Sequence, residues 1–156
     1  MITTPEQIDL WRSTSSENQR LEFKEAKNQL DNQKLYKYCV AIANEGGGNL
    51  ILGVVDKPPR PVVGTSSFNN TIKMAEKIFE AIGFLVDIDE VAHPDGRVVV
   101  FHIPSRPKGT AYHLDGAYLM RSGEKLVPMS EDQLRRIFAE GAPDWLEEPS
   151  RRTLDA

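Results

Sequence analysis

With 156 residues, 40% of them hydrophobic and 27% charged, the chain is long enough to bury a core as one domain, which excludes wholesale disorder and a fibrous protein. Its apolar runs fall far short of the roughly 20 residues of a membrane helix, and no signal sequence opens it, so we expect a cytoplasmic protein without a membrane partner. The net charge of −4 neither supports nor excludes nucleic-acid binding, because binding responds to the local potential rather than to the total charge.

The first half of the chain predicts helices that alternate with strands. A helix is expected over 5–12, and a half-buried strand over 21–24, where apolar and polar residues alternate. Apolar residues with helical spacing predict a second helix over 32–45, which the glycines at 46–48 end. The apolar run over 49–55 then predicts a central strand that is covered on both faces.

The second half adds two helices and four strands to the prediction. A third helix is expected over 68–82, and Ser130 begins a last helix with Gln133 completing a capping box. Turn signals separate four strands, near 84–91, 97–103, 117–121 and 125–128. The whole pattern predicts an α/β (α+β) fold, a mixed sheet with flanking helices in a single domain over 1–140. Residues 141–156 are predicted to be a tail or a linker to a further domain.

Three carboxylates and a lysine form the most informative constellation. Glu17 precedes the strand that carries Glu22 and Lys24 on one face, and Asp56 follows the central strand. Oxygen ligands of this kind hold Mg²⁺ or Mn²⁺, and the bound metal can activate water and neutralise charge on a phosphate, with lysine assisting. The spacing alone also fits a structural interpretation, in which Glu22 and Lys24 face solvent and Asp56 caps a turn.

A glycine-rich segment and two basic loops offer contacts for phosphate. The segment 44–49 joins a helix to a strand and could present backbone N–H groups, but it lacks the Gly-Lys-Ser/Thr of a Walker A loop and also serves as a plain helix stop. Cations stand beside flexible glycines in two later loops, and they also fit ordinary solvated loops. These cations are Arg106, Lys108, Arg121 and Lys125.

Three motifs follow one another along the chain: RLEFKEA, then LYKYCVAIANEGGGNLILGVVD with Gly64 after it, and finally GAYLMRSGEKLVPMS. In their order and spacing they resemble the Schlafen AlbA-type family, also called the divergent AAA-4 domain, from about residue 17 to 140. The resemblance implies an α/β fold and nucleic-acid binding. Members occur in bacterial proteins, often as the N-terminal module of transcriptional regulators or RecG-like helicases, and in animal Schlafen proteins, which implies a regulatory or defence role.

The resemblance also implies a metal site. In animal Schlafens two glutamates and an aspartate form a metal-dependent nuclease site that acts on structured RNA such as tRNA. Glu17 and Glu22 match the two glutamates, Asp56 matches the aspartate through the strand that ends G-V-x-D, and Lys24 matches the family lysine. These four are therefore the candidate catalytic residues. Animal Schlafens build their cleft from two lobes and this chain holds one, so a nuclease would require a homodimer.

The sequence leaves three possible functions. The first is a nucleic-acid-binding module for DNA or RNA, in which Lys24, Arg106, Lys108, Arg121 and Lys125 contact phosphates and no cofactor is needed. The second is an endonuclease in which Glu17, Glu22 and Asp56 bind Mg²⁺ or Mn²⁺. The third is a protein-interaction or dimerisation module, which the acidic pI of about 5.4 favours, whereas the family resemblance favours the first.

Overall fold

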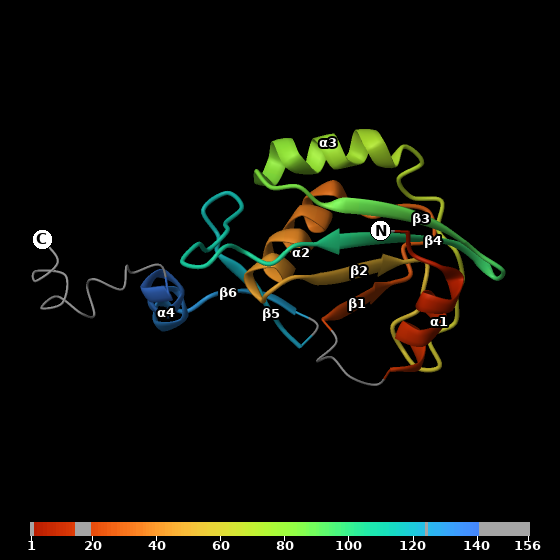
Figure 1. Ribbon diagram of the computed structural model, residues 1–156, viewed down its shortest axis with the longest axis horizontal. Coiled ribbons are helices and arrows are strands. Elements are labelled where there is room, and N and C mark those ends of the chain that lie inside the picture. The colour runs from red at the N-terminus through yellow and green to blue at the C-terminus, as the bar shows by residue number, and fades with distance from the viewer. Residues whose placement is uncertain (1, 15–19, 124, 141–156) are drawn as a thin grey trace, which may run out of the picture.

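The computed structural model of the protein describes residues 2–14, 20–123 and 125–140. Four helices and six strands lie within these residues, and they form one α+β domain of the predicted class (Figure 1). In chain order the elements are α1 (Pro5–Ser13), β1 (Leu21–Lys24), α2 (Asn32–Asn44), β2 (Gly48–Leu52), α3 (Thr71–Ile82), β3 (Asp87–His93), β4 (Gly96–Ile103), β5 (Leu119–Ser122), β6 (Lys125–Pro128) and α4 (Glu131–Glu140).

The main sheet is mixed and has the strand order β1-β2-β4-β3. Strand β1 runs parallel to β2, so that Glu22 lies opposite Leu50, while β4 is antiparallel to both of its neighbours. Strand β2 is interior, as its apolar sequence predicts, but it ends at Leu52 and not at residue 55. The chain turns out of the sheet at Gly53, whose φ of +98° is a left-handed value that a strand cannot continue.

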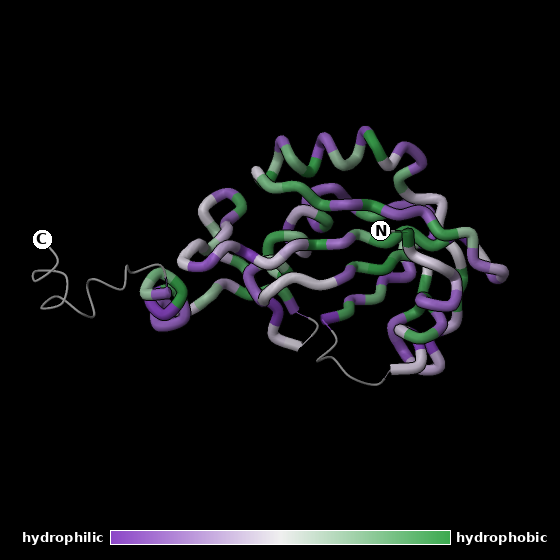
Figure 2. Tube along the Cα trace, in the orientation of Figure 1, coloured by the Kyte–Doolittle hydropathy of each residue, from purple (hydrophilic) through white to green (hydrophobic). Residues whose placement is uncertain are grey.

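Helices cover the sheet on both faces. Leu50 and Leu52 pack with α2 and α3 in one apolar cluster, whereas Ile51 packs with Ile8 of α1 in another. Because successive strand side chains point to opposite faces, an interior strand between two helical layers must be apolar at every position. Figure 2 shows hydrophobic colour over the second half of β2 and the middle of β4. No helix of the described residues is long and apolar enough to cross a membrane.

A small antiparallel sheet, β5 with β6, lies beside α2 and leads into α4 (Figure 1). The predicted capping box at the start of α4 is confirmed: the Ser130 hydroxyl accepts from the Gln133 N–H at 3.2 Å, and the Ser130 N–H donates to the Gln133 side chain at 2.8 Å. This second sheet brings residues from late in the chain to the C-terminal end of α2.

Several predicted boundaries were wrong by a few residues. Helix α3 starts at Thr71 rather than 68, because the Asn70 side chain accepts from the Lys73 N–H at 3.0 Å and caps the helix there. Strand β3 occupies 87–93 rather than 84–91, since its hairpin with β4 extends to the pair of His93 and Gly96. The predicted tail over 141–156 lies outside the described residues.

Candidate functional site

Glu22 occupies the centre of the candidate site, on the face of β1 that α2 covers. It shares that face with Lys24, as the alternation in the sequence predicts, but the face is not open to solvent and Glu22 is only 6% exposed. Burial raises the pKa of Glu22 above its usual value, and the charges of Arg121 and Lys24 oppose this rise. The solvent-facing interpretation of Glu22 is therefore wrong.

Arg121, which lies on β5 of the second sheet, forms an ion pair with Glu22 of β1. Its Nη1 lies 3.3 Å from Glu22 Oε1, and its Nε donates to Glu45 Oε2 at 2.9 Å. The same Nη1 lies 3.4 Å from the Leu21 carbonyl oxygen. One guanidinium thus meets two carboxylates, and with its side chain only 11% exposed it joins β5 to both β1 and the end of α2.

The charges of Lys24 and Asp56 both act on Glu22, with Lys24 lowering its pKa and Asp56 raising it. The Lys24 ammonium lies 4.8 Å from the centre of the Tyr38 ring. Burial alone would lower the pKa of Lys24, but Tyr38 and the carboxylates of Glu22 and Asp56 outweigh burial and raise it. Asp56 follows β2 in the loop outside the sheet, and its charge adds to the raised pKa of Glu22. Lys24 thus shares the face of Glu22, while Asp56 lies in the loop after β2 and affects both through its charge.

The described residues do not by themselves fit a divalent metal ion. Within 2–14, 20–123 and 125–140, no three His, Cys, Asp or Glu side chains are grouped so that they could hold one. The carboxylate of Glu22 is already held by Arg121. Glu17, the third predicted ligand, lies outside the described residues. Of the three predicted ligands, this part of the chain therefore holds Glu22 and Asp56.

The glycine-rich turn after α2 is shaped by close packing. Gly47 has a φ of +87°, and a Cβ there would lie 2.8 Å from both the Ile103 carbonyl oxygen and the Ser105 nitrogen. A Cβ on Gly48 would collide with the Arg20 carbonyl, while the Arg20 side chain donates to the Gly46 carbonyl at 2.6 Å. The turn therefore packs directly against the start of β1 and the end of β4, which accounts for the glycines without a phosphate.

Asn44, the last residue of α2, has a structural role that the sequence does not reveal. Its amide nitrogen donates to the carbonyls of Tyr112 at 2.9 Å and Leu119 at 2.8 Å, and its amide oxygen accepts from the Tyr112 N–H at 2.8 Å. The side chain is buried, so these bonds satisfy all three partners away from water. Asn44 holds the loop before β5, and hence β5 and Arg121, against α2.

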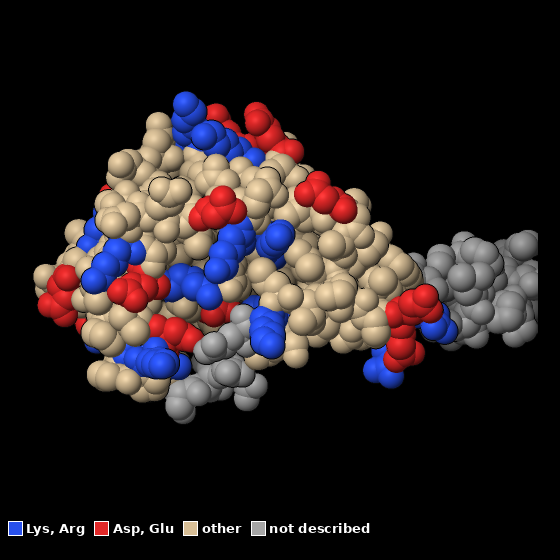
Figure 3. Space-filling model, turned by 180° about the vertical axis from the view of Figure 1, so that it is seen from behind, with Lys and Arg blue, Asp and Glu red and all other residues tan. Residues whose placement is uncertain are grey.

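Of the four cations predicted to contact phosphate, two form ion pairs within the chain and two are exposed. Arg106 makes a two-pronged ion pair with Glu140, at 2.6 and 3.0 Å, which lowers the pKa of Glu140 to about 2. Arg121 is engaged with Glu22 as described, whereas Lys108 and Lys125 are exposed. Seen from behind, the molecule carries Lys and Arg side chains interleaved with Asp and Glu rather than one continuous basic surface (Figure 3).

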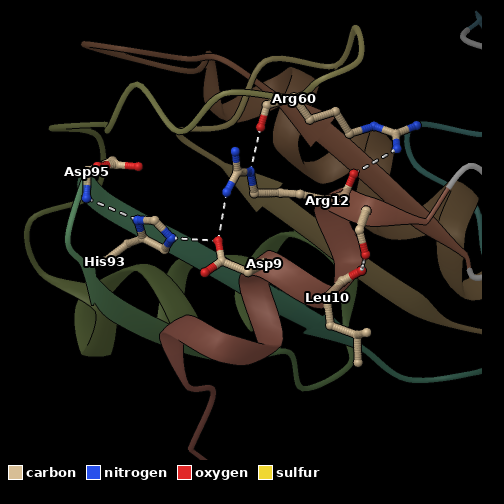
Figure 4. Close-up of polar contacts among 7 residues, drawn as sticks. Asp9, Leu10, Arg12, Arg60, His93 and Asp95 are labelled. Atoms are coloured by element: carbon tan, nitrogen blue, oxygen red, sulfur yellow. Dashed lines mark hydrogen bonds and ion pairs between the residues drawn. The ribbon is translucent and has the colours of Figure 1, made fainter.

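A clip of two arginines holds the loop of Asp56 against α1. Arg12 Nε donates to the Arg60 carbonyl at 2.6 Å, and Arg60 Nη1 donates in return to the Arg12 carbonyl (Figure 4). The same Nη1 also donates to the Thr14 carbonyl. Arg60 Nε donates to the Asp56 carbonyl at 3.2 Å, and its guanidinium lies 4.9 Å from the Phe23 ring centre. The clip fixes the backbone of Asp56 relative to β1, and no sequence pattern had indicated it.

Two carboxylate–histidine contacts hold the N-terminal segment against the sheet, one through Asp9 of α1 and one through Thr3, which precedes α1. His93 of β3 lies 2.8 Å from Asp9, which also accepts from Arg12 at 2.7 Å (Figure 4). At the other end, His102 of β4 lies 2.8 Å from Asp89, which accepts from the Thr3 hydroxyl at 2.6 Å. These contacts explain both histidines as structural residues.

The fold and the site define a single α+β module with a buried glutamate–arginine pair at the junction of its two sheets. The family model "Schlafen, AlbA_2" matches residues 17–130. The chain therefore belongs to the Schlafen AlbA_2 family, and the resemblance inferred from its motifs is confirmed. No curated protein matches the chain.

Several solved structures share the fold, among them these two. The DIP2311 protein from Corynebacterium diphtheriae superposes with a TM-score of 0.66 at 19% identity, over 90% of this chain and 33% of that one. The chain thus spans about a third of that protein's length. The N-terminal domain of a RecG-related protein from Nitrosomonas europaea superposes with a TM-score of 0.53 at 17% identity, over 84% of this chain and 92% of that domain.

Proposed function

We propose that this chain is a nucleic-acid-binding module. The observation that carries the proposal is the family match over residues 17–130. The fold it shares with a domain of a protein named as related to the DNA helicase RecG adds support. Since Arg106 and Arg121 are engaged in internal ion pairs, the exposed Lys108 and Lys125 are the phosphate contacts that we propose, with Lys24 beside Glu22.

Exchanging Lys108 and Lys125 together for glutamine should weaken binding and flatten its salt dependence. Each phosphate contact releases counterions. Losing two contacts should therefore reduce the slope of the log binding constant for duplex DNA against log salt concentration by about 1.8. The measurement is fluorescence anisotropy with labelled tRNA, single-stranded DNA and duplex DNA between 50 and 200 mM salt, concentrations chosen from the range over which such contacts act.

The matched control is Lys73→Gln with Lys77→Gln, which removes the same charge from the exposed side of α3. It should leave the slope close to that of the wild type. Equal losses in the two double variants would contradict the assignment to Lys108 and Lys125, and a wild-type chain that binds none of the three probes would remove the proposed function.

A second candidate function is a metal-dependent endonuclease, because the Asp56 carboxylate raises the pKa values of both Glu22 and Lys24. It also requires Glu17 as a ligand. Asp56→Asn should then reduce Mn²⁺-dependent cleavage of tRNA by about 100-fold or more, while binding in EDTA persists or tightens, because a negative charge near the phosphates is gone. Gel assays with Mg²⁺, Mn²⁺ or EDTA check this. Absence of cleavage by the wild type with either metal leaves the binding module, and cleavage that survives Asp56→Asn contradicts the ligand assignment.

A further inference from the structure

A groove of about 510 Å³ lies between α3 and the start of β3. Three large apolar side chains along it are exposed to an unusual degree: Ile72 by 76%, Leu85 by 70% and Phe79 by 48%. Three less exposed apolar side chains also line it, namely Ala75, Val86 and Ile88. Single exposed apolar residues are ordinary, but a contiguous group in a groove marks a surface that binds something.

The helix α3 carries a second apolar stripe that the core does not use. Met74 and Ile78 are buried against the rest of the domain. Ile72, Ala75 and Phe79 recur with helical spacing and line the groove instead. A surface helix needs one apolar stripe to dock on its own domain. The second stripe therefore has no partner in the core described above.

The groove is acidic at its rim. Glu76, Glu80 and Asp87 line it, and no Lys or Arg stands among the described residues that do. Such a rim repels phosphate, so this is not a surface for nucleic acid. Two copies of the chain that met groove to groove would bring these carboxylates together, which disfavours a second copy as the occupant. The charge is complementary to a segment that carries Lys or Arg.

One wall of the groove is the edge of the main sheet. Strand β3 ends the order β1-β2-β4-β3, and β4 is its one strand partner within the described residues. Figure 1 shows α3 running alongside this outer strand. An edge strand keeps the N–H and C=O groups of alternate residues free for an added strand, and extended peptides bind such edges. The edge therefore favours an extended segment.

We propose that the groove between α3 and β3 is the docking site for an extended, basic segment of another protein. The apolar side chains of that segment lie against Ile72, Phe79 and Leu85. Its Lys or Arg side chains face Glu76, Glu80 and the other carboxylate of the rim. This inference goes beyond nucleic-acid binding and does not depend on it.

The test uses the full chain, labelled with ¹⁵N, and a nine-residue capped peptide that alternates valine and lysine. We expect the peptide to shift the amide resonances of residues 71–80 and 85–91. Glu76→Gln with Glu80→Gln should weaken its binding about three- to tenfold, as two partly exposed charge contacts are lost. Phe79→Ala should weaken it about tenfold through lost apolar contact, since the side chain is half-exposed and not needed by the core.

Two controls make the outcome decisive. Lys73→Gln with Lys77→Gln alters the same helix outside the groove and should not weaken peptide binding. Both groove variants should bind nucleic acid as the wild type does and keep its circular dichroism spectrum. Any of four results would overturn the proposal: no resonance shift in the groove, equal binding of a valine–glutamate peptide, shifts of the same amides on dilution of the chain alone, or shifts caused there by duplex DNA.

Discussion

Arg121→Met should lower the free energy of unfolding by about 3–5 kcal/mol at neutral pH, the range for removing one partner of a buried ion pair. The side chains of Arg121 and Glu22 are 11% and 7% exposed. Methionine keeps much of the arginine stem's volume, so the loss comes from the charge left behind and not from a cavity. Urea denaturation of the variant and the wild type at pH 7 measures this difference.

The loss in free energy of unfolding that Arg121→Met causes, hereafter the deficit, should grow as the pH rises. Burial already raises the pKa of Glu22, and the variant loses the cation that opposes this rise. The native state then holds a proton at pH values where the unfolded chain has released it, so native stability falls as pH rises from the unfolded pKa through the native pKa. The deficit should therefore be largest at neutral pH and shrink as pH falls toward the usual range of a glutamate.

The double variant Arg121→Met with Glu22→Gln is the matched control, because it also removes the buried charge of Glu22, while Glu45 loses its partner in both variants. It should be more stable than Arg121→Met alone at pH 7 and should lose most of the pH dependence. A deficit in the single variant that is the same at pH 5 and pH 7 would contradict an unpaired Glu22 as its cause.

Asn44→Ala should lower the free energy of unfolding by about 3 kcal/mol, since each of its three hydrogen bonds contributes about 1 kcal/mol. The change also leaves the Tyr112 N–H and two carbonyls without their partner at a buried position. Thermal or urea denaturation measures the loss, and faster amide exchange at Tyr112 should accompany it.

Asn32→Ala serves as the control for Asn44→Ala, because Asn32 is exposed in the first turn of the same helix. Its effect should stay within about 0.5 kcal/mol, as is usual for surface substitutions. Asn44→Asp should be at least as harmful as Asn44→Ala, since a carboxylate would face two carbonyl oxygens. Similar stabilities of Asn44→Ala and Asn32→Ala would show that the three hydrogen bonds of the Asn44 side chain contribute little to the free energy of unfolding.

Local patterns in the sequence predict most of the fold. The helical spacing of Leu35, Tyr38, Cys39 and Ile42 predicts α2, and the unbroken apolar run predicts β2 as an interior strand. The end of β2 was misplaced because apolar composition continues beyond the backbone turn at Gly53. Alternation correctly assigns Glu22 to one face of β1, but it does not tell whether a helix covers that face.

The candidate site was less predictable, because its contacts join distant parts of the chain. Glu22 and Arg121 are 99 positions apart, and the bonds of Asn44 reach 68 and 75 positions. Arg121 lies on β5, two positions before Gly123, and an arginine in this sequence context can meet a phosphate or an internal carboxylate. The docking groove was missed for a related reason, since helical spacing identifies apolar residues on α3 without telling which of them the core covers.

The strand order also limits how this module can be divided. Strand β2 takes one neighbour from before it in the chain and the other from after α3, so each half of the sequence holds an incomplete sheet. A fragment that ends after α3 would lack both β4 and β3, and the remaining piece would carry their hairpin without β2, a two-stranded unit of marginal stability. Neither fragment contains all the strands of the main sheet, so we expect the module to fold only when both halves are present.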